Sequence, residues 1–163
     1  MIRLLLVLAC LAVVVGALWA MRVGWRHRVA RQFGLGSLPE PATELGYPLL
    51  PAETGLYVGT TSAASWQDRI AAHGLGRRAA ATAFLFPAGL VIDRVGDSSI
   101  YLPVASIMDA RLAPGLAGKV VGAGGLLVVR WRLGDAMLDT GFRADDKGSY
   151  PEWVRAISGL VHA

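Results

Sequence analysis

Hydrophobic positions follow three different spacings along the chain, and the first is an unbroken run. Residues 4–21 are 18 consecutive positions without a charge. As a helix they would be about 27 Å long at 1.5 Å per residue, close to the roughly 30 Å thickness of a bilayer core. Because a helix bonds its backbone groups internally, this run predicts a transmembrane helix. The predicted anchor includes Leu4, Leu11, Leu18, Trp19 and Met21.

The residues that flank this run predict its orientation. Arg3 alone precedes it, whereas four arginines follow it closely: Arg22, Arg26, Arg28 and Arg31. Since basic residues are retained on the cytoplasmic side, we expect a single-pass protein of the inner (plasma) membrane, with its N-terminus outside and its C-terminal domain in the cytoplasm. Each arginine near an anionic leaflet adds about 1 kcal/mol of attraction. Trp25 lies among them, and indole rings favour the membrane interface.

A cleaved export signal is the alternative interpretation of the same segment. Its small residues around Gly16 resemble those that precede a cleavage site. However, the apolar run is longer than the core of a usual export signal, and the arginines directly behind it oppose translocation. The sequence therefore favours a retained signal-anchor, and a cleaved signal stays open as the second interpretation.

Proline and glycine mark a break between this anchor and the rest of the chain. Residues 32–54 contain four prolines and three glycines, which interrupt helical and strand patterns alike. We therefore divide the chain into an anchor with its basic cluster (1–31), a Pro/Gly-rich linker (32–54) and a folded domain (55–163).

The folded domain begins with short strand-like runs separated by turn signals. These runs are rich in β-branched and aromatic residues, which favour strands. They lie at residues 56–61, 83–86, 90–95, 99–102 and 106–111. Gly96 and Asp97 form a two-residue hairpin signal after the third run. The pattern predicts a β-rich domain.

Alternation is clearest in two later runs, 126–133 and 136–143, which a Gly-Asp turn joins. Apolar side chains on one face of the first run are Leu127, Val129, Trp131 and Leu133. Arg130 and Arg132 point to the other face, as a half-buried antiparallel hairpin requires. We expect one of these two arginines to pair with Asp139 on the exposed face, where a pair is worth about 0–1 kcal/mol.

The last segment changes to helical spacing. Its apolar face consists of Trp153, Val154, Ile157, Leu160 and Val161, which predicts an amphipathic helix. Ser149 and Glu152 have the spacing of a capping box, in which each side chain bonds a free backbone N–H at the helix start. A second, shorter helix is expected at residues 66–72.

Composition and charge exclude several classes of function. The sequence pI is about 9.7, but five arginines before residue 32 produce the excess, since 11 of the 16 Lys and Arg residues and all 12 Asp and Glu residues follow. The near-neutral domain therefore predicts no nucleic-acid partner. A single cysteine, Cys10, allows no internal disulfide, and the three histidines lack metal-site spacing. Because nucleophile and phosphate-loop motifs are absent, we expect neither catalytic residues nor a metal or cofactor.

The order of elements resembles the pleckstrin-homology-like (PH-like) fold, a bent antiparallel barrel of about seven strands that a C-terminal helix caps. The chain is similar to actinobacterial single-pass membrane proteins with a cytoplasmic PH-like domain, often encoded near pyrimidine-biosynthesis genes and loosely labelled transporters or export proteins. The resemblance lies in the helix of Trp153 and in residues 57–61, 66–70, 89–92, 100–103 and 140–142. It implies that this tryptophan packs into the barrel, and it brings no catalytic residue.

Basic residues between the first two expected strands are the candidate binding surface. They are Arg69, His73, Arg77 and Arg78, near where lipid-binding PH domains hold phosphate groups. Guanidinium forks match phosphate, so the three arginines are candidate contacts for phosphate or anionic lipid. We predict a membrane-anchored, non-enzymatic adaptor that docks a cytoplasmic protein partner. Headgroup sensing and an accessory role in a transport or export system are the alternatives.

Overall fold

The computed structural model describes residues 7, 10–23 and 35–162, which belong to two units. The first unit spans Met1–Gly34 and is helical at residues 10–23, and the second spans Leu35–Ala163. Residues of the predicted anchor and basic cluster that lie outside the described residues are Leu4, Trp25, Arg26, Arg28 and Arg31.

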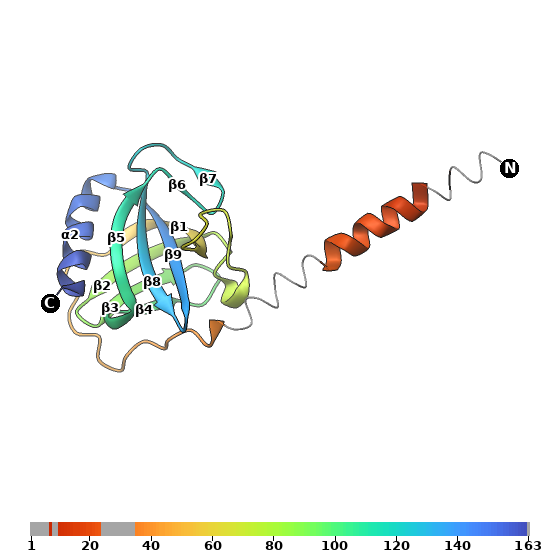
Figure 1. The fold of residues 1–163 in the computed structure, drawn as a ribbon. Helices are drawn as coiled ribbons and strands as arrows, with labels where there is room; N and C mark the ends of the chain where they lie inside the picture. Colours follow the sequence, from red (N-terminus) through yellow and green to blue (C-terminus); the bar gives the residue numbers. More distant parts are fainter. Residues whose placement is uncertain (1–6, 8–9, 24–34, 163) are drawn as a thin grey trace. The chain divides into compact units, whose positions relative to one another are not determined.

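Four consecutive strands form one half of the sheet in the second unit (Figure 1). They are β1 (Glu53–Ser62), β2 (Ala79–Phe86), β3 (Gly89–Arg94) and β4 (Ile100–Pro103). Each pairs antiparallel with the next. β-Branched and aromatic residues suit these pleated, half-buried surfaces, and the four corresponding runs expected from the sequence are confirmed.

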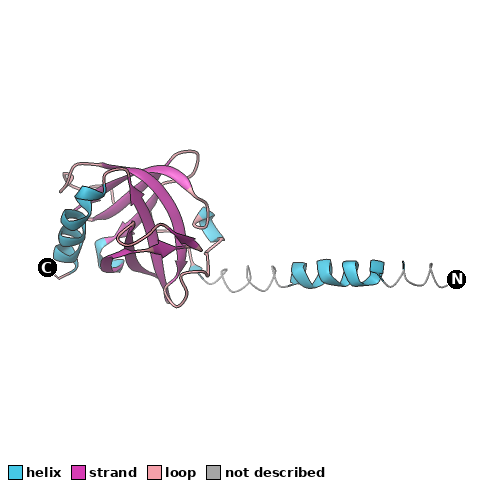
Figure 2. Cartoon of the chain, turned by 90° about the horizontal axis from the view of Figure 1, so that it is seen from above, coloured by secondary structure: helices cyan, strands magenta, loops and turns pink. Residues whose placement is uncertain are grey.

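Three strands from the later part of the chain complete the sheet. They are β5 (Ile107–Ala113), β8 (Leu126–Leu133) and β9 (Ala136–Ala144). β9 pairs with β1, so the strand order is β4-β3-β2-β1-β9-β8-β5. The 3-10 helix η3 (Val104–Ser106) connects the two edge strands. The sheet is strongly curved (Figure 2), as the resemblance to the PH-like fold implied.

The β8–β9 hairpin follows the predicted alternation. Leu133 pairs with Ala136 across a two-residue turn, in which Gly134 takes the positive φ of 58° that this turn requires. The four alternating apolar residues of β8 named above all belong to the main core. The hairpin, its register and its buried face were therefore predictable from the sequence.

The C-terminal helix α2 (Tyr150–Val161) closes the core beside β5 (Figure 1). Trp153 and Ile157 are buried in the main core, which confirms the predicted apolar face and the position of the tryptophan. The capping box is wrong: Ser149 makes no side-chain cap and donates instead to the carbonyl of Asp146. A 3-10 turn, η4 (Lys147–Ser149), precedes the helix, so Ser149 is already in helical conformation.

A small hairpin of β6 (Gly115–Leu116) and β7 (Lys119–Val120) was not predicted, because two-residue strands are too short to show a periodicity. Leu116 and Ala117 pack against Val58, Leu126 and Val128 in a second apolar cluster. Val128 lies between two core-facing residues of β8, so this cluster is on the outer face of the sheet. We call residues 113–125 the flap.

Part of the segment expected as a linker packs on the domain. Leu35 is buried in the main core, and Leu38 and Leu50 pack against it. The backbone N–H of Leu49 donates to the carbonyl of Leu85 in β2 at 2.8 Å. Residues 35–54 therefore contribute to the folded unit and lie along its surface.

Candidate functional site

The β1–β2 connection folds back onto the end of β1. The Thr60 N–H donates to Leu75 O at 2.8 Å, and the Ile70 N–H donates to Thr60 O at 2.9 Å. Ile70 and Leu75 are buried in the main core. These bonds to β1 replace the internal bonds of a helix, so the helix expected at residues 66–72 is wrong. The 3-10 helix η2 (Ala72–Gly74) follows, with His73 at a φ of 55°.

Arg69 joins two segments that are distant in the sequence. Its Nη1 donates to Gly76 O at 2.7 Å, within the β1–β2 connection. Its Nη2 donates to Ala117 O at 2.6 Å, within the flap. Arg69 also forms an isolated β-bridge with Thr61. Arg69 is one of the predicted phosphate contacts, and its guanidinium is directed toward backbone carbonyls of the fold.

Arg77 and Arg78 lie on the surface just before β2. The Arg77 side chain is 73% exposed, and its Nε is 3.5 Å from Asp97 Oδ2 in the β3–β4 connection. Arg78 is exposed as well. His73, the fourth basic residue of this connection, forms a hydrogen bond of 2.6 Å between Nε2 and Gly36 O. The structure thus places two solvent-accessible guanidinium groups next to each other in the sequence and beside the β3–β4 connection.

Arg94 is a buried arginine of this region that the sequence interpretation missed. Its Nε donates to Ser98 O at 2.9 Å and its Nη1 to Gly74 O at 2.8 Å. Its guanidinium carbon lies 5.0 Å from the centroid of the Tyr57 ring, a cation–π contact. Asp97 Oδ2 is 3.9 Å from Nη1. Arg94 lies at an even spacing from the core-facing residues of β3. This spacing is the signal that would have predicted the burial of its side chain.

Tyr57 connects this region to a chain of buried hydrogen bonds. Its hydroxyl donates to Leu75 O at 2.6 Å and lies 2.7 Å from Thr60 Oγ1. Thr60 Oγ1 is 2.7 Å from Thr140 Oγ1, which accepts from Trp131 Nε1 at 2.9 Å. Burial raises the pKa of Tyr57 to about 12, against the opposing effects of the Thr60 hydrogen bond and nearby arginines. Each hydroxyl can donate once and accept once, so the chain is fully satisfied and serves the fold.

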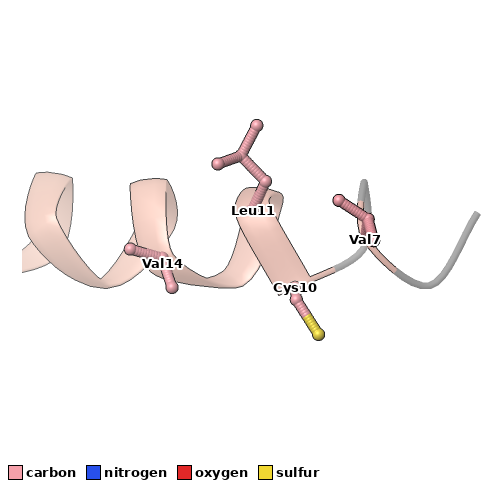
Figure 3. A pocket seen from close by; sticks show the side chains of 4 residues that line it. All are labelled: Val7, Cys10, Leu11 and Val14. Atoms are coloured by element: carbon pink, nitrogen blue, oxygen red, sulfur yellow. The ribbon is translucent and has the colours of Figure 1, made fainter. Parts of the chain in front are cut away.

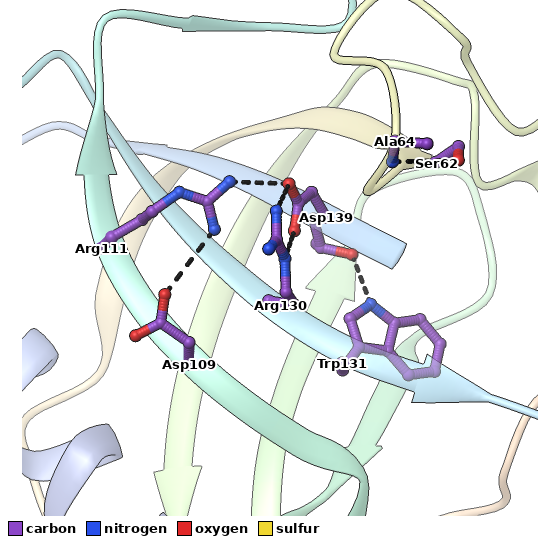
Figure 4. A network of polar contacts seen from close by, with 8 residues as sticks. Ser62, Ala64, Asp109, Arg111, Arg130, Trp131 and Asp139 are labelled. Atoms are coloured by element: carbon purple, nitrogen blue, oxygen red, sulfur yellow. Dashed lines mark hydrogen bonds and ion pairs between the residues drawn. The ribbon is translucent and has the colours of Figure 1, made fainter. Parts of the chain in front are cut away.

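Arg111, Arg130 and Asp139 form a network on the outer face of the sheet (Figure 4). Arg130 donates to both carboxylate oxygens at 2.8 and 2.9 Å, and Arg111 donates to Oδ2 at 2.6 Å. The predicted pair is confirmed for Arg130, whereas Arg132 lies near the Met108 sulfur. The expected exposure is wrong, because the second arginine leaves the Asp139 side chain 5% exposed. Burial alone would raise the pKa of Asp139, but the hydrogen bonds from both arginines lower it below its ordinary value.

The helix at residues 10–23 presents apolar side chains to its surroundings. Exposed members of the predicted anchor are Leu11, Leu18, Trp19 and Met21, and Arg22 is exposed too. Figure 3 shows a shallow apolar surface of this helix, which Val7, Cys10, Leu11 and Val14 line. Within the described residues, no helix combines the length and the hydropathy that a membrane span requires. The transmembrane helix stays a prediction.

Two other features bear on ligand chemistry. The described part of the chain contains no group of three or more His, Cys, Asp or Glu side chains that could hold a metal ion. A shallow polar depression lies between β1, β9 and η4, lined by Gly55, Leu56, Arg143, Ala144, Asp145 and Lys147. Its Asp145 already accepts a hydrogen bond from Thr54 at 2.9 Å. Two exposed arginines, Arg77 and Arg78, follow each other in the β1–β2 connection, and Arg77 lies near Asp97, which also approaches buried Arg94.

Comparisons with known proteins identify the domain. Residues 35–158 match the family described as "Bacterial PH domain-like". No curated protein matches the chain. A solved structure titled "Vav1 inhibited by an allosteric inhibitor: Vav1 inhibitors block GEF activity" is 16% identical, with a TM-score of 0.42. That match covers 86% of this chain and 34% of the other, so this chain spans about a third of that length. Since the family match covers well over half of its residues, the chain belongs to the bacterial PH domain-like family.

Proposed function

We propose that the chain is a membrane-anchored, non-enzymatic adaptor whose PH-like domain docks a protein partner at the cytoplasmic face of the inner membrane. The observation that carries the proposal is the exposed apolar helix at residues 10–23. Its exposed side chains include Leu11, Val13 and Trp19. Each fully buried aliphatic side chain gains about 1.5–3 kcal/mol, so another apolar phase that covers this helix would stabilise it. The uncharged run at residues 4–21 favours a bilayer as that phase.

The domain supplies the interaction part of the proposal. PH-like domains are commonly interaction or lipid-binding modules and are generally non-catalytic. In this domain the buried Tyr57, Thr60 and Thr140 bond one another, and buried Asp139 is neutralised by two arginines. Polar groups that satisfy one another in this way stabilise a fold and leave little capacity for acid–base chemistry. This supports a binding role over an enzymatic one.

A reporter of cellular compartment fused after Ala163 tests the anchor and its orientation. We expect cytoplasmic activity of the fusion and retention of the chain in membranes washed with alkaline carbonate. The matched control replaces the four arginines from Arg22 to Arg31 with glutamine. This change should weaken the retention of the C-terminal domain in the cytoplasm. Export of the wild-type fusion, or its release by carbonate, would reject the proposal.

Partner docking needs its own experiment. Affinity purification of the full chain from detergent-solubilised membranes should recover a protein partner in a fixed ratio. The matched control is the anchor alone, residues 1–34, which should recover none of it. Repeated purification of the chain by itself, with and without chemical cross-linking before lysis, would contradict the adaptor role.

Binding of anionic headgroups is a second candidate, which one observation favours. The folded unit starts at Leu35, and Gly36 is hydrogen-bonded to His73 in the same connection that carries the exposed Arg77 and Arg78. The chain therefore enters the domain at the connection that carries two exposed arginines. Vesicles with and without anionic lipid, mixed with residues 35–163 after a check of folding by circular dichroism, test this candidate. Equal binding to neutral and anionic vesicles at low salt would reject it.

A further inference from the structure

The flap lies over two glycines that face each other across β1 and β9. Gly59 and Gly141 are a cross-strand pair in the middle of the sheet. A Cβ atom at Gly141 would lie 2.7 Å from Leu116 Cδ2, and one at Gly59 would lie 3.6 Å from the Ala117 Cβ. The missing Cβ atom at Gly141 thus leaves a seat on the outer face of the sheet. The side chain of Leu116 fills this seat.

Apolar residues surround the seat and depend on the flap for their burial. Val58, Leu126 and Val128 form the rest of this cluster, separate from the main core. They are at most 4% exposed with the flap in place. The surface under the flap is therefore an apolar groove, with Val58 and Val128 beside the paired glycines.

The flap is held closed by the packing of Leu116 and Ala117 in the second apolar cluster and by single hydrogen bonds at its base and tip. Its base is closed by the Val121 N–H, which donates to Pro114 O at 2.8 Å. At its tip, Arg69 Nη2 donates to Ala117 O, and Ala117 has a φ of 53°, a backbone conformation that L-residues rarely adopt. The following strand residue Val120 is 73% exposed. A segment whose buried side chains are confined to Leu116 and Ala117, with one residue in a rare backbone conformation, belongs to the part of a fold that opens first.

We infer that the flap is a lid over a docking groove, and that Leu116 and Arg69 are the two residues that hold the lid closed. The flap itself shows which chemistry the open groove accepts: an aliphatic side chain in the glycine seat, followed by a backbone carbonyl that takes the hydrogen bond of Arg69. The occupant is an extended segment of a protein partner with these two features. This inference rests on the proposed adaptor function, and it makes Arg69 a positioning residue of the lid.

A lipid acyl chain is the competing occupant. It would fill the glycine seat, but its hydrocarbon offers no acceptor to replace the Ala117 carbonyl, so the half-buried guanidinium of Arg69 would lose that hydrogen bond. A peptide segment supplies both the side chain and the carbonyl. The geometry therefore favours a protein segment, and lipid is kept as an outcome of the test.

Thiol labelling of a cysteine under the lid measures its opening. The full chain carries Cys10→Ser and Val128→Cys, so the only thiol lies beneath the flap. We expect Leu116→Ser to raise the labelling rate at least tenfold, while hydrogen exchange of the β8–β9 core stays unchanged. The control Val120→Ser alters the same flap at an exposed position and should change the rate less than twofold.

Hydrogen exchange of the chain without Val128→Cys provides an independent measurement. Flap amides such as that of Val121 should exchange faster in Leu116→Ser and in Arg69→Gln than in the wild type. Flap exchange and cysteine labelling that rise only together with exchange of the main core would show that the flap is a fixed part of the fold. That result would overturn the lid.

A peptide that copies residues 113–121 of this chain tests the occupant. We expect it to slow labelling at least fivefold in the chain with Leu116→Ser, and to lose this effect when its own leucine is replaced by serine. In the chain with Arg69→Gln, the protection from labelling that this peptide provides should fall by at least twofold. Equal labelling with both peptides would overturn the docking groove, and protection by anionic vesicles alone would assign the groove to lipid. Because labelling reports the lid directly, a failure here is distinct from a failure of the topology and purification tests.

Discussion

Two groups of arginines in the same domain are held in opposite ways. In the outer-face network, Arg130 and Arg111 converge on the carboxylate of Asp139, which is almost fully buried. In the loop-end group, which consists of Arg69, Arg77, Arg94 and Asp97, the shortest contacts of Arg69 and Arg94 are to backbone carbonyls. Asp97 lies 3.5–3.9 Å from Arg77 and Arg94 and is 18% exposed.

The difference between the two groups shows where positive charge remains available for an anionic ligand. A carboxylate both positions and neutralises a guanidinium, whereas a carbonyl positions it without cancelling its charge. The outer-face network therefore stabilises strand packing. The loop-end group keeps a net positive charge next to solvent, which is the property that an anion-binding surface needs.

The largest expected effect is at the carboxylate of the outer-face network. Asp139→Asn removes the charge that Arg111 and Arg130 share, and leaves two guanidinium groups facing each other. We expect the free energy of unfolding to fall by about 2–3 kcal/mol, somewhat less than for a fully buried pair because both arginines are partly exposed. Denaturant unfolding of the full chain in detergent measures it. The control Asp109→Asn, at a 52% exposed carboxylate 3.8 Å from Arg111, should cost less than about 0.5 kcal/mol.

The same network predicts a dependence of stability on acid. The folded-state pKa of Asp139 is lowered relative to its ordinary value of about 3.9. Its contribution is therefore complete above the unfolded pKa and is lost as the pH falls below about 4, through the folded pKa. Asp139→Asn should remove part of this acid dependence. An identical decline in wild type and variant would contradict the assignment.

The next effect concerns Arg77, the exposed arginine of the loop-end group, and its exposed neighbour in the sequence, Arg78. Arg77→Gln combined with Arg78→Gln should weaken binding of residues 35–163 to anionic vesicles about thirtyfold at low salt, since each of the two basic groups near such a surface contributes about 1 kcal/mol. Vesicle sedimentation measures it. A matched control removes an exposed charge from β8: Arg132→Gln should change binding less than twofold. An equal loss in both variants would show that net charge, and no particular surface, decides binding.

Sequence patterns predicted the outer-face pair and only part of the loop-end group. The outer-face pair was visible because Arg130 and Asp139 lie in a hairpin of strict alternation, whose register places them opposite each other. In the loop-end group, Arg69 and Arg77 were candidates from the sequence, but Arg94 was hidden because it is held by backbone carbonyls, and any residue supplies a carbonyl. The flap was missed for a related reason: its strands are two residues long, and Leu116 meets its glycine seat only in three dimensions.

A smaller effect is expected at the aromatic ring beneath Arg94. Tyr57→Phe keeps the ring but removes the hydroxyl that donates to Leu75 O, which retains only the bond from the Thr60 N–H. The change should lower the free energy of unfolding by about 1 kcal/mol at neutral pH. Burial raises the folded-state pKa of Tyr57 to about 12, above an unfolded value of about 10. Wild-type stability therefore declines as the pH rises from about 10 towards 12, because the unfolded chain ionises first.

Thermal unfolding at pH 7 and at pH 10.5 measures both parts of this prediction. The variant lacks the ionisable group at this position, so the difference between wild type and Tyr57→Phe should narrow at the higher pH. Burial also raises the pKa of Tyr150, which is present in both proteins and serves as an internal control. If Tyr57→Phe lowered the free energy of unfolding by more than about 3 kcal/mol at pH 7, the loop-end group would contribute as much to stability as the outer-face network.

The smallest effect is the one that separates the two groups most directly. Asp97→Asn removes the carboxylate of the loop-end group, yet Arg94 keeps its carbonyl partners and Arg77 is mostly exposed. We expect stability to fall by only about 1 kcal/mol, because the Asp97 carboxylate lies at 3.5–3.9 Å from both arginines and makes no close hydrogen bond to either. Binding to anionic vesicles should rise about threefold because a negative charge is lost beside Arg77. Unfolding and sedimentation of the same preparation measure both. A stability loss as large as that of Asp139→Asn, without tighter vesicle binding, would mean that Asp97 neutralises its arginines as Asp139 does, and the contrast between the two groups would disappear.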